Sequence, residues 1–340
     1  MKPTVLVVGA GASVEYGLKD GWGLLKAVEA ATHFVGGNFN RQTISMLEAI
    51  QHYVRTETAN DLDTHVRFEA LGSSFSSQIS AFDSVDEALH HWSAEPEIVL
   101  LGKAAIAMMI LEYERESWLA TADFNDQRIE TEGWLWPLFK LIIEHTERSN
   151  FADALKNLTI INFNYDRVIE HFLYNVFQYR MKIPSHVAAE MICRDGFILR
   201  PYGTVSPLPW QKPAGNAFGV GAPEHYFSLT KNLRTYTETV ERTDTDDQIA
   251  DAMAKAHTIA ILGFGFAPAN LALLKPRGNP FANRHALATC FEIPIENHAA
   301  LRSSVKRALR LNSIPDLNDL TARQFFDDLN LTLKHAIWSD

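Results

Sequence analysis

The feature that most constrains this chain lies at its start, where a short apolar run leads into a turn of small residues. Residues 4–8, Thr-Val-Leu-Val-Val, are mostly β-branched, which is typical of a parallel strand buried on both faces. The turn that follows consists of Gly9, Ala10, Gly11, Ala12 and Ser13. Its glycines let the backbone approach a bound group, and its N–H groups, with the positive end of the next helix, would form an anion site. The usual dinucleotide fingerprint has a third glycine where this chain has Val14, so a nucleotide site and a merely tight turn both stay open.

Length, charge and cysteine content narrow the class of protein. The 340 residues suffice for one large α/β domain or two domains. The net charge of −10 argues against a general nucleic-acid binder. Cys193 and Cys290 fit a reducing cytoplasm and cannot build a four-cysteine zinc site, and no His/Asp/Glu spacing demands a metal. The apolar run 104–111 is too short to span a bilayer, and the first strand leaves no room for a signal peptide, so we expect a soluble, cytoplasmic protein without bound metal.

The pattern after the first turn is helical for more than a hundred residues. Residues 17–23 are too rich in glycine for a helix interior, and we interpret them either as a mobile flap beside a ligand or as a plain surface loop. A helix over 97–118 is apolar almost all round and should be buried, and 134–146 keeps helical spacing. We therefore expect residues 24–157 to form a helical module inserted between the first strand and the rest of the sheet.

Strands and helices alternate after this module. Strands are predicted at 158–163, 197–199, 258–262 and 287–293, with helices between them, a loop or lid over 207–223, and closing helices at 299–311 and 319–338. The sequence therefore predicts an α/β fold, a doubly wound Rossmann-like parallel sheet. Its parts are a Rossmann domain over 1–23 and 158–298, the inserted helical module over 24–157, and C-terminal helices over 299–340.

Polar residues and glycines follow several of these strands, at the sheet edge where ligands of open α/β proteins are held. Asn164 and Asp166 come directly after the strand at 158–163. Asp166 stands where the next helix needs an N-cap, so a capping role and a ligand-binding role both stay open. Gly263 and Gly265 form a second glycine pair after a strand, which indicates a second place where backbone meets ligand.

Taken in order, three stretches resemble the sirtuin-like domains of bacterial NAD-hydrolysing antiphage defence proteins. Residues 7–13 are similar to that family's glycine-alanine-glycine-x-serine turn, residues 161–166 to its Asn-x-Asp strand end, and residues 261–266 to its later glycine loop. The tracts 100–112 and 134–143 resemble the family's inserted helical module. The resemblance covers most of the chain.

The resemblance implies an NAD+ glycohydrolase that releases nicotinamide and ADP-ribose. Breaking the bond between nicotinamide and ribose develops oxocarbenium character on the sugar, so the site must hold the ribose and align a nucleophile. By resemblance, Asn164 positions the attacking water, Asp166 orders the ribose-binding turn, and Tyr202 takes the place of the family's base. The expected NAD-binding residues are Gly9, Ala10, Gly11, Ala12 and Ser13 for the diphosphate, Gly263 and Gly265 on the adenosine side, and Gly17 and Gly203.

Two departures from the family pattern bear on activity. Tyr202-Gly203 replaces a histidine-glycine pair whose histidine is the general base, and a phenol with a pKa near about 10 is a poor base at neutral pH. Lys19 stands where a proline is usual. Two histidines are considered as alternative bases. They are His65, in the helical module, and His171, which we interpret as a helix-surface residue. The missing cysteine pairs also separate the chain from zinc-containing deacetylating sirtuins.

Two hypotheses follow. The first is an NAD+ glycohydrolase acting in antiphage defence; the second is a catalytically degenerate nucleotide-binding or scaffolding subunit that lost its base at Tyr202. By resemblance we expect a homo-oligomer that binds NAD+ or ADP-ribose. Its activation is expected through self-assembly or through a partner such as an Argonaute-like protein or a hexameric DNA-translocating ATPase. No direct nucleic-acid or membrane binding is expected.

Overall fold

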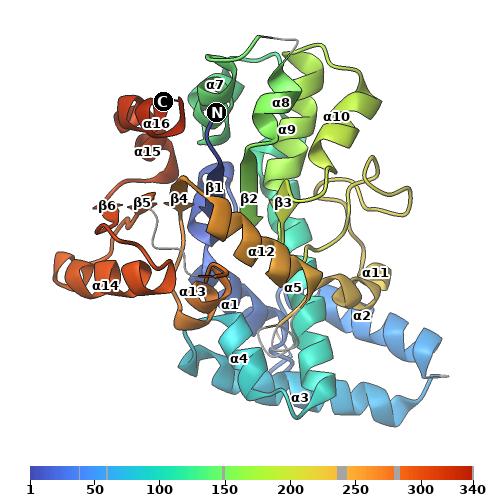
Figure 1. The fold of residues 1–340 in the computed structure, drawn as a ribbon. Coiled ribbons are helices and arrows are strands. Elements are labelled where there is room, and N and C mark those ends of the chain that lie inside the picture. The colour runs from blue at the N-terminus through green and yellow to red at the C-terminus, as the bar shows by residue number, and fades with distance from the viewer. Residues whose placement is uncertain (38, 59, 148–149, 236–242, 279–283, 339–340) are drawn as a thin grey trace.

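A computed structural model describes residues 1–340 except 38, 59, 148–149, 236–242, 279–283 and 339–340 (Figure 1). Six parallel strands of the described residues form one sheet in the order β3-β2-β1-β4-β5-β6. The order reverses between β1 and β4, as in dinucleotide-binding sheets, so the predicted Rossmann-like α/β fold is confirmed. The strands are β1 (Thr4–Val8), β2 (Leu158–Asn162), β3 (Ile198–Leu199), β4 (Thr258–Leu262), β5 (His285–Thr289) and β6 (Asp316–Asn318).

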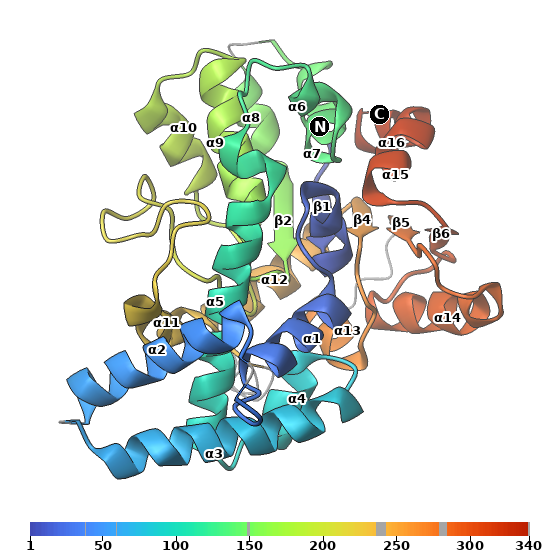
Figure 2. The same ribbon diagram turned by 180° about the vertical axis from the view of Figure 1, so that it is seen from behind.

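The central strands are largely apolar, and helices cover both faces of the sheet. Every residue of β1 and β4 is buried. Helix α12 (Asp244–Lys255) crosses one face in Figure 1, and the view from behind in Figure 2 shows α5 (Pro96–Glu116) on the opposite side. The predicted buried helix at 97–118 is thus α5, which is buried over most of its length.

A helical region occupies the chain between β1 and β2. The four α-helices that follow η1 (Ala10–Tyr16) lie beyond the carboxyl ends of the strands, in the lower part of both views (Figures 1 and 2). The region contains η1 (Ala10–Tyr16), α1 (Gly21–Ala31), α2 (Arg41–Glu57), α3 (Leu62–Gln78), η2 (Ile79–Ala81), α4 (Val85–His91), α5, η3 (Trp118–Thr121), α6 (Arg128–Thr131), α7 (Leu135–Ile143) and α8 (Phe151–Leu155).

The start of this region differs from the prediction that residues 17–23 form a flap or loop. Helix α1 begins within that stretch, at Gly21, because the Asp20 carboxylate accepts a hydrogen bond from the N–H of Gly23 at 2.8 Å and so caps the first turn. Glycine is tolerated there because the first turn of a helix makes few bonds of its own. Residues 17–20 keep a loop conformation, with φ +90° at Gly17, where η1 ends.

The remaining helices lie between the later strands and, for the last two, after β6. They are α9 (Val168–Tyr179), α10 (Ser185–Ile192), α11 (Pro223–Leu229), η4 (Thr230–Asn232), α12, α13 (Pro268–Leu273), η6 (Ile295–Asn297), α14 (His298–Ala308), α15 (Ala322–Asp328) and α16 (Asn330–Trp338).

The carboxyl-terminal part of the chain holds three further differences. Edge strand β6 was not predicted: it has three residues, none of them buried, and therefore lacks the apolar pattern of the inner strands. The single helix predicted over 319–338 is two helices, α15 and α16. Strand β5 also begins two residues earlier than predicted, at His285, which pairs with Thr258 of β4.

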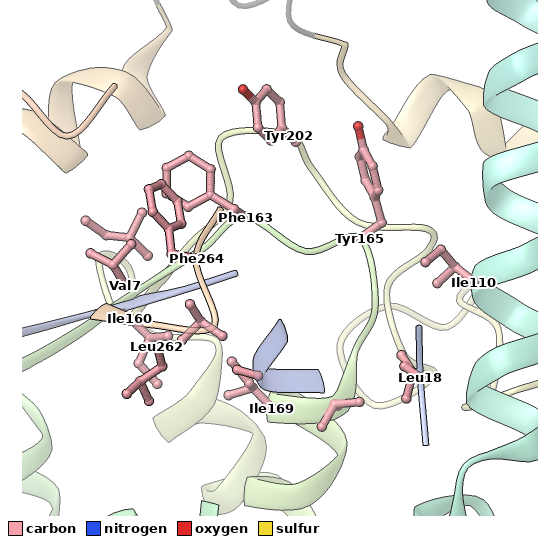
Figure 3. Packing of buried hydrophobic residues seen from close by; sticks show 14 of the residues in the cluster. Val7, Leu18, Ile110, Ile160, Phe163, Tyr165, Ile169, Tyr202, Leu262 and Phe264 are labelled. Atoms are coloured by element: carbon pink, nitrogen blue, oxygen red, sulfur yellow. The ribbon is translucent and has the colours of Figure 1, made fainter. Parts of the chain in front are cut away.

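The register brings the ends of the three central strands together. Val8, the last residue of β1, lies beside Asn162 on β2 and beside Leu262 on β4. Figure 3 shows the core at this edge, where Phe163 and Phe264 lie next to the strand residues. The segments that carry the candidate residues therefore leave the sheet side by side.

Within the described ranges, no helix combines the length and apolar character required to cross a membrane.

Candidate functional site at the carboxyl edge of the sheet

The two glycine turns, after β1 and β4, pack directly against each other. The N–H of Gly9 donates to the Leu262 carbonyl and that of Gly11 to the Gly263 carbonyl, both at 2.9 Å. A Cβ on Gly9 would lie 2.5 Å from the Gly263 oxygen, and one on Gly263, whose φ is +54°, would lie 2.0 Å from the nitrogen of Ala12. Backbone packing therefore requires these glycines. From the sequence alone, this reason for glycine could not be distinguished from the close approach of a ligand.

This packing changes what the first turn offers to an anion. The N–H groups of Gly9, Gly11 and Ala12 all donate to carbonyl oxygens of the protein. Gly265, in contrast, is exposed, and a Cβ there would meet nothing within 4 Å. At this edge, the backbone that is open to a ligand is therefore that of the turn after β4, at Gly265.

Ser13, Asn164 and Asp166, all predicted site residues, form one buried hydrogen-bonded cluster. The Asn164 Nδ2 donates to the Gly9 carbonyl and to the Ser13 Oγ, each at 3.0 Å. The Ser13 hydroxyl donates in turn to the Asp166 Oδ2 at 2.8 Å. The three side chains are at most 7% exposed. The carboxyl ends of β1 and β2 thus share a single polar network.

The partners of Asn164 fix the orientation of its amide. A backbone carbonyl only accepts hydrogen bonds, so the NH₂ group must face Gly9 and the Oδ1 must point the other way. In the described part of the chain no hydrogen bond reaches this Oδ1, and it is not among the enclosed unpaired atoms. The cluster therefore presents one accessible acceptor, the Asn164 Oδ1.

Of the two roles left open for Asp166, the structure shows the one at the start of helix α9, and the ligand-binding role stays a prediction. Its Oδ1 accepts the N–H of Val168 at 3.1 Å in the first turn of α9, while its Oδ2 holds Ser13. Burial raises the pKa of Asp166 to about 6, against the lowering effects of the Arg200 charge and the Ser13 hydrogen bond. Both carboxylate oxygens are engaged, so Asp166 organises the loop.

An ion pair that the sequence analysis did not single out holds this loop from outside. The Arg200 guanidinium donates to the carbonyls of Asn164 at 2.6 Å and of Asp166 at 2.8 Å. It also bonds both Glu170 carboxylate oxygens, at 2.8 and 2.6 Å. The available signal was the position of Arg200 directly after β3, at the same sheet edge.

A second, fully buried ion pair joins the loop to helix α5. Glu114 is 0% exposed and Arg167 1%. The Glu114 carboxylate accepts the Arg167 backbone N–H at 2.8 Å and its side-chain Nε at 3.0 Å, and the Arg167 Nη2 binds the second oxygen. A helix predicted from its sequence to be apolar almost all round thus carries the carboxylate that anchors the residue after Asp166.

No protein-family model and no curated protein matches this chain. It is therefore assigned to no family, and its likeness to sirtuin-like domains rests on the three motifs and the two helical tracts given above. Among the residues that the structure describes, no group of three or more His, Cys, Asp or Glu side chains is placed to hold a metal ion.

Tyr202 lies at the same edge but outside the Ser13–Asn164–Asp166 cluster. It is 4% exposed, its ring lies edge-on to Phe163 with centroids 5.8 Å apart, and its hydroxyl donates to the Asn270 Oδ1 at 2.5 Å. Gly203 has a φ of +75°, and a Cβ there would lie 2.1 Å from the Asn232 carbonyl oxygen. The backbone turn thus requires glycine at position 203, and contacts with Phe163 and Asn270 hold the Tyr202 side chain.

The two histidines considered as bases are engaged elsewhere. The His171 ring stacks on Phe218 with centroids 4.2 Å apart, and burial lowers its pKa to about 4. It is half-buried among aromatic rings, which differs from the predicted helix surface. His65 lies on α3, where its Nε2 is 3.1 Å from Glu69 on the same helix.

Proposed function

We propose that this protein hydrolyses NAD+ to nicotinamide and ADP-ribose. One observation carries the proposal: a buried cluster presents the Asn164 Oδ1 as an oriented acceptor that no other described residue engages, where β1, β2 and β4 end. This is the edge at which open parallel sheets hold their ligands, next to the point where the strand order reverses.

Each residue then has a physical role in the proposal. The Asn164 Oδ1 accepts a hydrogen bond from a water and orients it toward the anomeric carbon of the ribose. Ser13 and Asp166 hold the amide in that orientation, and Arg200 holds the backbone of the loop. An uncharged amide contributes by proximity and orientation, which are large effects in reactions of this kind. Gly265 offers the dinucleotide an open stretch of backbone.

A specific observation favours the second candidate function, a nucleotide-binding subunit without turnover. Tyr202 stands where the resembled family has its histidine, and its hydroxyl hydrogen is directed to Asn270. If Tyr202 is only a hydrogen-bonding group and nothing replaces the base, ADP-ribose binds and NAD+ is not cleaved. Binding without turnover, followed by turnover in Tyr202→His, would select this candidate.

The test of the proposed function is release of nicotinamide from NAD+. The purified protein is assayed alone and with the product of the neighbouring gene, because assembly or a partner is expected to be needed for activity. Asn164→Ala should abolish release. Asn175→Ala is the matched control, since Asn175 also donates its amide to a backbone carbonyl, that of His171, but lies on helix α9 away from the cluster. Equal turnover in both variants would contradict the proposal.

A further inference from the structure

Helix α4 of the helical region reaches the candidate site through one side chain, Asp86. The Tyr165 hydroxyl, from the residue between Asn164 and Asp166, lies 2.5 Å from the Asp86 Oδ1. Asp86 is half-buried, and no ion pair within the described residues involves it. In the described part of the chain, this first-turn carboxylate of α4 is thus held by a phenol and by no cation.

The Tyr165 phenol has a second hydrogen-bond acceptor besides Asp86. The Arg234 carbonyl oxygen lies 3.2 Å from the Tyr165 hydroxyl. When Asp86 is ionised, the phenol donates to the carboxylate. When Asp86 is protonated, it can donate to the phenol oxygen, and the phenol hydrogen turns to Arg234. Both protonation states are therefore hydrogen-bonded, as a group that takes up and releases a proton requires.

The Tyr165 phenol also lies close to Tyr202. The rings of Tyr165 and Tyr202 have centroids 6.4 Å apart. Figure 3 shows both side chains leaving their loops in the same direction, with their hydroxyls away from the core formed by Val7, Ile160 and Leu262. Tyr202, the residue in the place of the family's base, is thus flanked by a phenol that has a carboxylate behind it.

We propose that Tyr165, backed by Asp86, is the acid–base group of this site. The inference rests on the proposed hydrolysis. The water oxygen bonds to the anomeric carbon while the bond from that carbon to nicotinamide breaks, and the bonding pair leaves with nicotinamide. The water proton passes to the Tyr165 oxygen as the phenol proton passes to Asp86, which later releases it to solvent. Tyr165 is the catalytic residue, and Asp86 acts through it as a positioning residue and proton acceptor.

The electrostatics of Asp86 are consistent with this role. Burial raises the pKa of Asp86 to about 6, and the hydrogen bond from Tyr165, the titratable group that faces it, lowers it. A group with a pKa close to neutral exchanges protons more readily than a phenol alone. The base predicted to be missing at Tyr202 would then be supplied by Tyr165, with Asp86 of the helical region as its proton acceptor.

The test compares Asp86→Asn and Tyr165→Phe with Glu87→Gln, a control that neutralises the adjacent, exposed carboxylate on the same helix. Asparagine keeps an acceptor for the phenol, so the fold should be retained. Both site variants should lower kcat by about 10²–10⁴-fold with little change in KM or in ADP-ribose binding, and the double variant should fall no further. The acid limb of the pH–rate profile should disappear in Asp86→Asn and persist in Glu87→Gln.

The outcomes separate the two proposals. If the parent cleaves NAD+ and Asp86→Asn keeps its rate and pH profile, the proton relay is wrong and the hydrolase stands. If Asp86→Asn loses ADP-ribose binding and stability together, Asp86 is structural and the relay is again wrong. If the parent releases no nicotinamide with any partner, the hydrolase proposal falls, and the relay falls with it.

Discussion

The buried ion pair between Glu114 and Arg167 gives the sharpest test of how the helical region supports the candidate loop. The perturbation is Glu114→Gln, which keeps the size of the side chain and removes its charge. Three donors of Arg167 and the N–H of Gly219, at 3.0 Å, converge on the two carboxylate oxygens. An amide in this place would turn its NH₂ group toward some of these donors, so at least one buried pair would become donor against donor.

The expected loss of stability follows from the burial of the pair. Arg167, 1% exposed, would keep its hydrogen bonds to the carbonyls of Asn216 and Ala217 but would lose its counter-charge. Removing one partner of a buried ion pair costs about 3–5 kcal/mol because the other charge is left uncompensated. The surface pair of Glu97, on the same helix, with Arg67 is roughly half exposed and should contribute at most about 1 kcal/mol.

The assay is the free energy of unfolding in urea for Glu114→Gln, Glu97→Gln and Arg167→Met, with the double variant Glu114→Gln/Arg167→Met. Glu114→Gln should lose several times more than Glu97→Gln. The double variant should lose less than the sum of its single variants, since it removes the uncompensated charge. A loss for Glu114→Gln as small as that for Glu97→Gln would refute the argument, as would strict additivity.

Three further predictions follow from the site. Gly9→Ala should cost about 1–3 kcal/mol of stability because its Cβ would lie 2.5 Å from the Gly263 oxygen, while Gly265→Ala, with open space, should cost much less; thermal unfolding of both variants checks this. Tyr202→Phe removes the hydrogen bond to Asn270, so it should cost about 1 kcal/mol and leave NAD+ turnover within about tenfold. The raised pKa of Asp166, about 6 against an ordinary 3.8, means that the folded state binds more protons between these values. This group's contribution is therefore complete below the lower value and is lost as pH rises through the upper one, and Asp166→Asn should flatten that part of the pH–stability curve by up to roughly 3 kcal/mol.

The sheet was predictable because its inner strands are buried on both faces and so read as short apolar runs. Thr4–Val8 and Thr258–Leu262 are such runs, and both are strands of the predicted length. Strand β6 escaped because an edge strand of three residues carries no such pattern. The start of α1 was not predicted because one hydrogen bond, from the Gly23 N–H to the Asp20 carboxylate, outweighs the poor helix propensity of the glycines after Asp20.

The candidate site was predictable only in part. The proximity of Asn164, Asp166 and Ser13 follows from parallel topology, since the carboxyl ends of neighbouring strands meet at one edge. The residues that hold this loop in place do not follow from the topology. Glu114 lies on a helix far away in sequence, and Asp86 lies on another such helix. Such long-range partners depend on how the helices pack, which no local pattern records. The packing of Gly9 on Gly263 is of the same kind.

The most direct measurement of the central claim, that Asn164 aligns a water for attack on NAD+, is the origin of the new oxygen in the product. The protein, with its activating partner where one is needed, is incubated with NAD+ in water enriched in ¹⁸O, and nicotinamide and ADP-ribose are analysed by mass spectrometry. We predict equal amounts of the two products, one ¹⁸O on the ribose of ADP-ribose, and loss of both products in Asn164→Ala but not in Asn175→Ala. ADP-ribose without the label, or labelled product formed equally well by Asn164→Ala, would contradict the claim.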